Sequence, residues 1–143
     1  MREILFRGKR LDNGEWVEGF YNYHDYIFND EPVRRHYILP LNAHDAVVVF
    51  PETVGQYTGL KDKNGKKIFE GDIVEAVLPR SKAQNGFVWP LMPVVFRDGI
   101  FGLLTDRDHV VTFRSFSPAV TLEVKGNIHD HPEMLKGDKA NEG

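Results

Sequence analysis

Residues 55–76 constrain the fold of this chain most, because an Asn-Gly pair separates two strand-like runs there. Residues 57–60 lead into a turn at residues 62–65, and residues 66–69 lead out of it. Asn-Gly between two such runs is the strongest short-range signal for a β-hairpin, because both residue types tolerate a positive φ. After a second tight turn at residues 70–72, the apolar run 73–77 predicts a buried strand. This stretch therefore organises a small β domain.

The segment before this stretch also has the pattern of strands and turns. Asn13-Gly14 predicts a hairpin over residues 5–20. A loop at residues 29–32 separates the ring-rich run 20–28 from a strand at residues 34–39. The β-branched run 46–50 predicts a strand that is covered on both faces.

The segment after it contains further short strands, of which the last places Val120, Leu122 and Val124 on one face. Residues 79–86 are polar and rich in strand breakers, so we expect a mobile loop there. Pro132 between polar residues predicts a single helical turn near the C-terminus. The later strands are predicted at residues 92–96, 100–104, 110–113 and 119–126.

Eight or more short strands at turn spacing predict a mostly β protein of barrel or sandwich type. We expect one β-rich domain over residues 1–136. Its parts would be an N-terminal hairpin region, 1–50, and a barrel-like region, 51–128. Residues 137–143 lack large apolar side chains and are expected to be disordered.

Composition excludes several classes of protein. The 143 residues contain no cysteine, so the fold has no disulfide, no thiolate nucleophile and no cysteine-ligated metal. The formal charge of -3 does not suggest a protein that wraps nucleic acid electrostatically. No signal peptide is evident, and no apolar run approaches the roughly 20 residues that span a membrane. We therefore expect a soluble cytoplasmic protein without a membrane partner.

Three blocks of the sequence carry a resemblance to the YopX family, small proteins of bacteriophages and prophages. The second block is the specific one, because no other family is known to us with that run. The blocks are MREILFRGKR with NGEWV, PETVGQYTGLKDKNG with EGDIV, and EVKGNIH followed by Pro132, Glu133 and Leu135. The resemblance implies a β-rich fold with an SH3-like barrel portion. No biochemical activity is established for the family, so it implies no catalytic residues.

A lysine cluster surrounds the tip of the central hairpin, with only Asp62 opposing it in the sequence. One interpretation is a basic finger that contacts phosphate. The other, which we favour, is a turn that charge keeps solvated, since edge lysines also discourage aggregation. The cluster consists of Lys61, Lys63, Lys66 and Lys67.

A second candidate site combines rings and arginines on both sides of the loop at residues 29–32. Such a group could pair across strands within the fold, which we favour. It could also form a protein-binding face, because interfaces are enriched in Tyr and Arg. A platform that stacks single-stranded nucleic acid is a third interpretation. The residues are Tyr21, Tyr23, Tyr26, Phe28, Arg34 and Arg35.

Metal binding and catalysis have little support in the sequence. His129 and His131 could bind a metal, but a strand-to-helix turn explains them more simply. Asp106 and Asp108 form a weak D-x-D pattern. No nucleophile elbow, P-loop or dinucleotide fingerprint is present. We therefore assign no catalytic, cofactor-binding or metal-binding residues.

These observations favour a non-enzymatic phage or prophage protein that binds a host or phage protein. Its working surface would be the ring-rich segment 20–37 or the segment 79–91. The alternatives are a nucleic-acid-binding module that uses the lysine hairpin 61–67, and an enzyme of an undetected type. Exposed strand edges also make a homo-oligomer possible.

Overall fold

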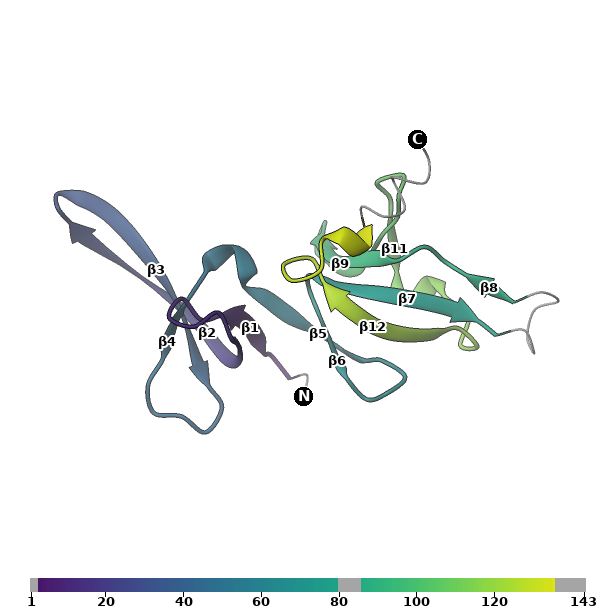
Figure 1. Cartoon of the computed structure of the whole chain (residues 1–143), viewed down its shortest axis with the longest axis horizontal. Helices are drawn as coiled ribbons and strands as arrows, with labels where there is room; N and C mark the ends of the chain where they lie inside the picture. Colours follow the sequence, from purple (N-terminus) through teal and green to yellow (C-terminus); the bar gives the residue numbers. More distant parts are fainter. Residues whose placement is uncertain (1–2, 80–85, 136–143) are drawn as a thin grey trace. The chain divides into compact units, whose positions relative to one another are not determined.

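The computed structural model describes residues 3–79 and 86–135. The chain is mostly β, as predicted, and its strands form two antiparallel sheets (Figure 1). By the contacts between Cα atoms, it divides into two compact units, residues 1–59 and residues 60–143. We describe each unit by itself.

The first sheet has the strand order β4-β3-β2-β1-β5-β6, and the neighbouring pairs from β4 to β5 are antiparallel. A short 3-10 helix, Pro51–Thr53, precedes β5, and β5 continues into unit 2. The strands are β1 Phe6–Lys9, β2 Trp16–Phe28, β3 Glu31–Pro40, β4 Val47–Val49 and β5 Gly55–Lys61.

The hairpin predicted over residues 5–20 is confirmed, with Lys9 opposite Trp16 and Phe6 opposite Gly19. Gly14 alone has a positive φ in its turn, at 73°. Residues 10–15 form the loop between the strands. It is therefore longer than a two-residue hairpin turn, in which both residues have a positive φ.

The prediction of a loop at residues 29–32 is wrong. Asn29 and Asp30 make a two-residue turn with φ of 50° and 63°, and β3 begins at once with Glu31 opposite Phe28. Asn and Asp are the residues other than glycine that tolerate the left-handed conformation best. This short turn fixes the register of the whole β2–β3 hairpin.

The buried side chains of unit 1 include Leu5, Ile38 and Val49. The prediction that residues 46–50 are covered on both faces is only partly confirmed. Val49 is buried, whereas Val47 and Val48 are half-buried and residue 46 is exposed. Among the described residues, β4 pairs with β3 along one edge, and its other edge meets only residues 9–11, through the bridge of Val49 to Arg10 and the hydrogen bond from the Leu11 N–H to the Val48 carbonyl.

The second sheet has the order β11-β10-β9-β7-β12, and β8 pairs with the end of β7. The central hairpin of β5 and β6 is confirmed, as is the buried strand after it. The elements of unit 2 are β6 Lys67–Phe69, β7 Asp72–Leu78, β8 Phe87–Val88, β9 Met92–Arg97, β10 Ile100–Leu104, β11 Val110–Thr112, the 3-10 helix Phe113–Ser115 and β12 Thr121–Asn127.

The core of unit 2 lies between these strands. Val120, Leu122 and Val124 pack together against its buried cluster, which confirms that they share a face. Trp89, Phe113 and Phe116 add rings at its margin. The buried residues are Ile68, Val74, Ala76, Met92, Val94 and Leu103.

Residues 133–135 are helical, which confirms the short turn predicted after Pro132. Most of the loop predicted at residues 79–86 and the tail 137–143 lie outside the described residues. None of the helices that are described is long and apolar enough to span a membrane. Residues 3–79 and 86–135 form no closed barrel, so the SH3-like portion stays a prediction.

Candidate functional site

The β2–β3 hairpin extends beyond its neighbouring strands (Figure 1). β1 pairs with β2 only up to Gly19, and β4 pairs with β3 at residues 36–38. In the described part of the chain, no third strand flanks residues 23–28 of β2 or residues 31–35 of β3. We call these two segments the arm. A two-stranded ribbon of this kind contributes little stability by itself.

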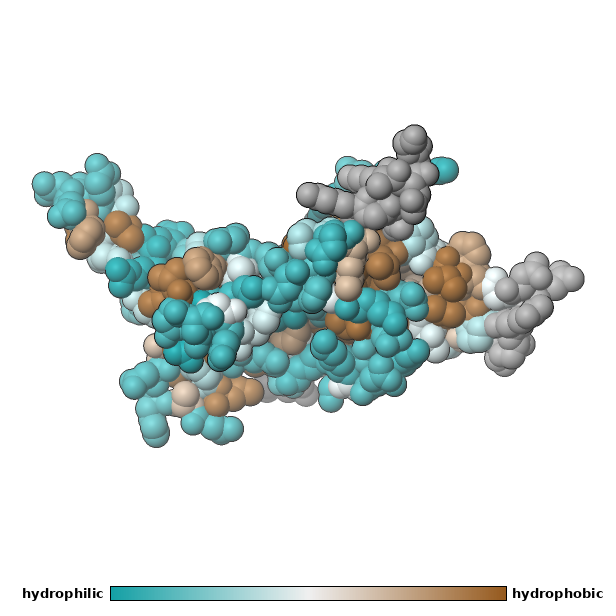
Figure 2. All heavy atoms as spheres, viewed as in Figure 1, coloured by the Kyte–Doolittle hydropathy of each residue, from teal (hydrophilic) through white to brown (hydrophobic). Residues whose placement is uncertain are grey.

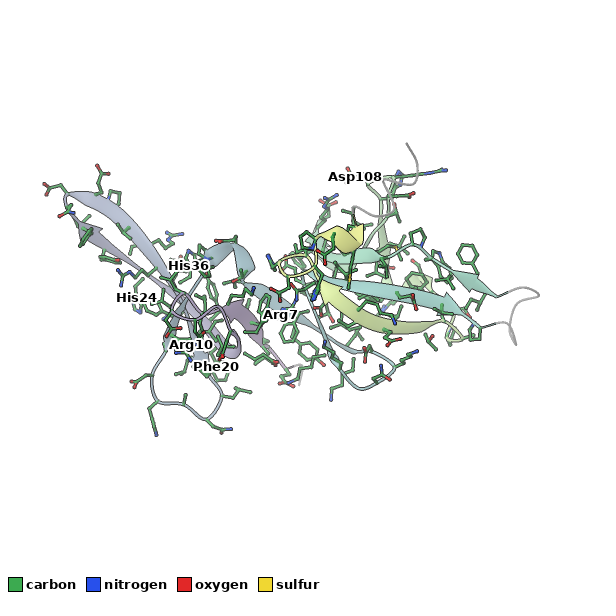
Figure 3. All side chains as sticks on the ribbon, in the orientation of Figure 1. Arg7, Arg10, Phe20, His24, His36 and Asp108 are labelled. Carbon is green, nitrogen blue, oxygen red and sulfur yellow. The ribbon has the colours of Figure 1, made fainter. Side chains whose placement is uncertain are left out.

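The six residues predicted as one binding surface lie on two opposite faces of the arm and its base. Asp25 is opposite Arg34, whereas His24 is opposite Arg35. Because neighbouring side chains in a strand point to opposite faces, the two arginines are separated. Figure 3 shows His24 and His36, which belong to the two different faces. Tyr21, Tyr23 and Arg34 share one face, which we call the Arg34 face. Tyr26, Phe28 and Arg35 share the other, which we call the Arg35 face.

On the Arg34 face, the charges are neutralised within the arm. The Arg34 guanidinium donates two hydrogen bonds to the Asp25 carboxylate, at 2.7 and 3.1 Å. These bonds hold the pKa of Asp25 below its ordinary value. The same guanidinium lies 4.2 Å from the ring centre of Tyr23, as in a cation–π contact.

Tyr21 belongs to the fold rather than to an exposed surface. Its hydroxyl shares a hydrogen bond of 2.5 Å with Nδ1 of His36, and the two rings are stacked at 5.8 Å. Phe6 lies 5.4 Å from the same Tyr21 ring. Burial raises the pKa of the Tyr21 hydroxyl. For this residue, the interpretation as cross-strand ring pairing is confirmed.

On the Arg35 face, the arginine has no acidic partner among the described residues. Its guanidinium lies 5.3 Å from the ring centre of Tyr26. His24 meets Tyr37 edge to face at 5.5 Å. The side chain of Phe28 is 60% exposed. This face therefore presents a cation among rings, with Glu31 near the tip of the arm as the acidic residue on the same face.

The Arg35 face continues into a shallow depression of about 520 Å³ at the base of the arm. Phe20, one of its lining residues, is 57% exposed. A second depression of about 510 Å³ shares Ala46 with it and includes Leu11 and Val48. The first is lined by Phe20, Tyr21, Asn22, His24, Tyr37, Leu39 and Ala46. Figure 2 shows apolar side chains among hydrophilic ones on the surface of this unit.

The lysine cluster is less isolated than its sequence suggests. The Lys63 ammonium lies 3.0 Å from the Glu123 carboxylate, and Lys125 pairs with the same carboxylate at 3.2 Å. The prediction that only Asp62 opposes these lysines is therefore wrong. The pairing with β12 brings Glu123 to the hairpin, and this contact is absent from any local pattern.

Asp62 has a structural role that the sequence reasoning missed. One carboxylate oxygen accepts hydrogen bonds from the backbone N–H groups of Asn64 and Lys66, both at 2.9 Å. The other accepts from the N–H of Val124 at 3.0 Å. The sequence contains one signal for this role. An Asp two residues before Asn-Gly is typical of a turn that an Asp side chain caps.

The histidines near the C-terminus belong to a turn around Asn127. The Asn127 side-chain oxygen accepts hydrogen bonds from the N–H groups of His129 and Asp130, and Nδ1 of His131 accepts from the Asn127 N–H at 3.2 Å. Within residues 3–79 and 86–135, no group of three or more His, Asp or Glu side chains could hold a metal.

The D-x-D pattern at residues 106–108 does not act as a unit either. The Asp108 carboxylate, in the loop between β10 and β11, pairs with Arg97 at the end of β9 at 3.1 Å. Both side chains are exposed, which is typical of a solvated ion pair of little consequence.

Comparison with known proteins places the chain in a family. One solved structure, the crystal structure of protein EF1440 from Enterococcus faecalis, is similar with a TM-score of 0.51. The two sequences are 23% identical, and the match covers 94% of this chain and 99% of that one. None of the curated proteins compared with this chain matches it. The family model described as YopX protein matches residues 5–136, so the chain belongs to the YopX family.

Proposed function

We propose that this YopX-family chain is a non-enzymatic phage or prophage protein that acts in the bacterial cytoplasm by binding another protein through its arm. One observation carries this proposal: large apolar side chains are exposed on both faces of a ribbon that no third strand flanks in the described part of the chain. Ile27 is 70% exposed, Phe28 60% and Tyr23 46%.

Leaving large apolar side chains exposed to water costs free energy unless a partner covers them. Exposed apolar patches of monomeric proteins mark binding sites, and rings and arginines dominate the energetics of protein interfaces. The arm carries both types of residue, and its unflanked edges also offer backbone groups for strand addition.

The test is a pull-down from a bacterial lysate with the tagged full chain, with and without nuclease. The variants separate the faces: Tyr23→Ala with Ile27→Ala, and Tyr26→Ala with Phe28→Ala. We expect a protein partner that survives nuclease and is lost with at least one pair. Ile100→Ala, at a residue of unit 2 that is 45% exposed, is the matched control. Retention of every captured protein by both pairs would exclude the arm.

Nucleic-acid binding by the lysine hairpin is the second candidate. The observation that favours it is that Lys125 joins the hairpin lysines, because it shares Glu123 with Lys63. The carboxylates of Glu75 and Asp62 also act on Lys63. If this candidate holds, an oligothymidylate will bind with an affinity that falls steeply as salt rises, and Lys61→Gln with Lys66→Gln will reduce it. An oligothymidylate affinity that does not change with salt concentration would exclude this candidate.

We also infer that unit 2 is the SH3-like portion of the fold. The hairpin after β5 is attached to β12 by two hydrogen bonds, from the Lys63 N–H to the Leu122 carbonyl at 2.8 Å and from the Val124 N–H to Asp62. These bonds extend the sheet order beyond β12, as a curled sheet requires. Backbone amide shifts and cross-strand NOEs in solution would test this closure.

A further inference from the structure

We propose that the Arg35 face takes a peptide segment of its partner that carries a large apolar side chain and a carboxylate within about four residues of each other. This inference rests on the proposed function and names the chemistry of the partner. The apolar side chain would occupy the depression at Phe20, and the carboxylate would pair with the Arg35 guanidinium.

The depression provides an apolar subsite of a suitable size. Its volume of about 520 Å³ falls within the range of ligand pockets. Phe20, Tyr37 and Leu39 supply its apolar walls, and Asn22 and His24 supply polar groups between the rings. Phe20 is more than half exposed, so covering its ring would remove apolar surface from water.

The cation lies at one end of this subsite. His24 lines the depression, and Arg35 is directly opposite His24 in the register of β2 and β3. Phe20 and His24 are four residues apart on the same face of β2, which is about 13 Å along a strand. An extended peptide that covers both positions therefore spans about four residues, which sets the spacing between its apolar and acidic side chains.

The charge on this face selects a carboxylate. Arg34, the sequence neighbour of Arg35, already has a carboxylate at 2.7 Å, whereas Arg35 has none within the described residues. The Tyr26 ring at 5.3 Å orients the Arg35 guanidinium without neutralising it. A planar guanidinium held in this way is suited to pair with a carboxylate through two hydrogen bonds.

Two other occupants fit less well. Single-stranded nucleic acid needs a series of cations along its backbone, whereas the arm offers Arg35 alone on this face and the whole chain carries a formal charge of -3. A second copy of the chain is the other alternative occupant of this face. The experiment distinguishes both alternatives from a peptide.

The test uses the purified full chain as bait for a random-peptide display library. We expect enriched peptides with an aromatic or large aliphatic residue and an Asp or Glu within about four residues of it. A synthetic peptide of the enriched sequence should bind about tenfold more weakly to Arg35→Gln, because one charge-assisted hydrogen-bonded pair is lost. It should also bind more weakly to Phe20→Ala.

The controls remove the same kinds of side chain away from this face. Arg34→Gln removes the same charge from a neutralised pair, and Ile100→Ala removes an apolar side chain of unit 2 that is 45% exposed. Both should leave peptide affinity unchanged within twofold, and circular dichroism should show that all four variants are folded.

Several results would overturn the proposal. They are an enriched set without acidic residues, no enriched peptide, unaltered affinity in Arg35→Gln, and equal losses in Arg34→Gln. Oligothymidylate binding that Arg35→Gln abolishes would assign the face to nucleic acid instead. A dimer in sedimentation equilibrium that Phe20→Ala dissociates would assign it to a second copy. If the peptide proposal fails while the Tyr23 and Ile27 pair still abolishes partner capture, the proposed function stands and only this face is excluded.

Discussion

The carboxylate of Asp62 accepts a hydrogen bond from the backbone N–H of Val124, a residue 62 positions away, at 3.0 Å. The same carboxylate also organises the central hairpin turn through the N–H groups of Asn64 and Lys66. One buried side chain thus shapes a local turn and attaches it to the strand β12. A turn residue therefore links the central hairpin to the last strand of unit 2.

Replacing Asp62 by Ala should lower the free energy of unfolding by about 3 kcal/mol, because three backbone donors lose their acceptor and two of the bonds organise the turn. Urea unfolding measured by far-UV circular dichroism tests this. Asp98→Asn, in the turn between β9 and β10, is the control and should change the free energy by less than about 0.5 kcal/mol. Equal stability of Asp62→Ala and the parent chain would contradict this role for Asp62.

The contribution of Asp62 to stability should depend on pH. Burial raises its pKa, but the N–H groups of Val124, Lys66 and Asn64 outweigh burial, so the folded pKa lies below the ordinary value of 3.8. A depressed pKa means that this contribution is complete above the unfolded value and is lost as the pH falls through the folded one.

The difference in unfolding free energy between the parent chain and Asp62→Asn should therefore be largest at neutral pH and shrink below about pH 4. Urea titrations at a series of pH values measure it. A difference that stays constant through this range would show that the charge of Asp62 is not what stabilises the turn.

Replacing Gly19 by Ala should disrupt unit 1 severely. A Cβ atom there would lie 1.9 Å from the carbonyl oxygen of Leu39, which is backbone of the paired strand. We expect a loss of about 3 kcal/mol or more, at the upper end of overpacking effects. The control is Gly14→Ala, which meets no atom within 4 Å but has a φ of 73°. It should cost about 1 kcal/mol, and a ranking in the reverse order would contradict the packing seen at Gly19.

Leu103 is fully buried in the core of unit 2, so Leu103→Ala should lower the free energy of unfolding by about 2–5 kcal/mol. Ile100→Ala, in the same strand β10, removes a side chain that is 45% exposed. That control should change stability by less than about 1 kcal/mol. Thermal and urea unfolding compare the two variants, and similar losses would mean that Leu103 is not a core residue.

Local patterns were sufficient for most strands and hairpins. Asn13-Gly14 and Asn64-Gly65 marked two of the turns, because few residues other than glycine adopt a positive φ at low cost. The polar run at residues 29–32 predicts a loop of four residues, whereas Asn29 and Asp30 alone form the turn. That error hid the register of β2 and β3, and with it the partners of Arg34 and Arg35.

By itself, the sequence determined the β class, the family and the positions of most turns, because these depend on residue types within a few positions of each other. Tertiary structure decided which charges remain without a partner. The two-residue turn places Asp25 opposite Arg34, and β12 brings Glu123 to Lys63. A shift of one residue in either pairing would exchange the faces, because side chains alternate along a strand. Such pairings depend on contacts between distant segments. Only the tertiary structure therefore determines that Arg34 has a carboxylate partner and that Arg35 has none among the described residues.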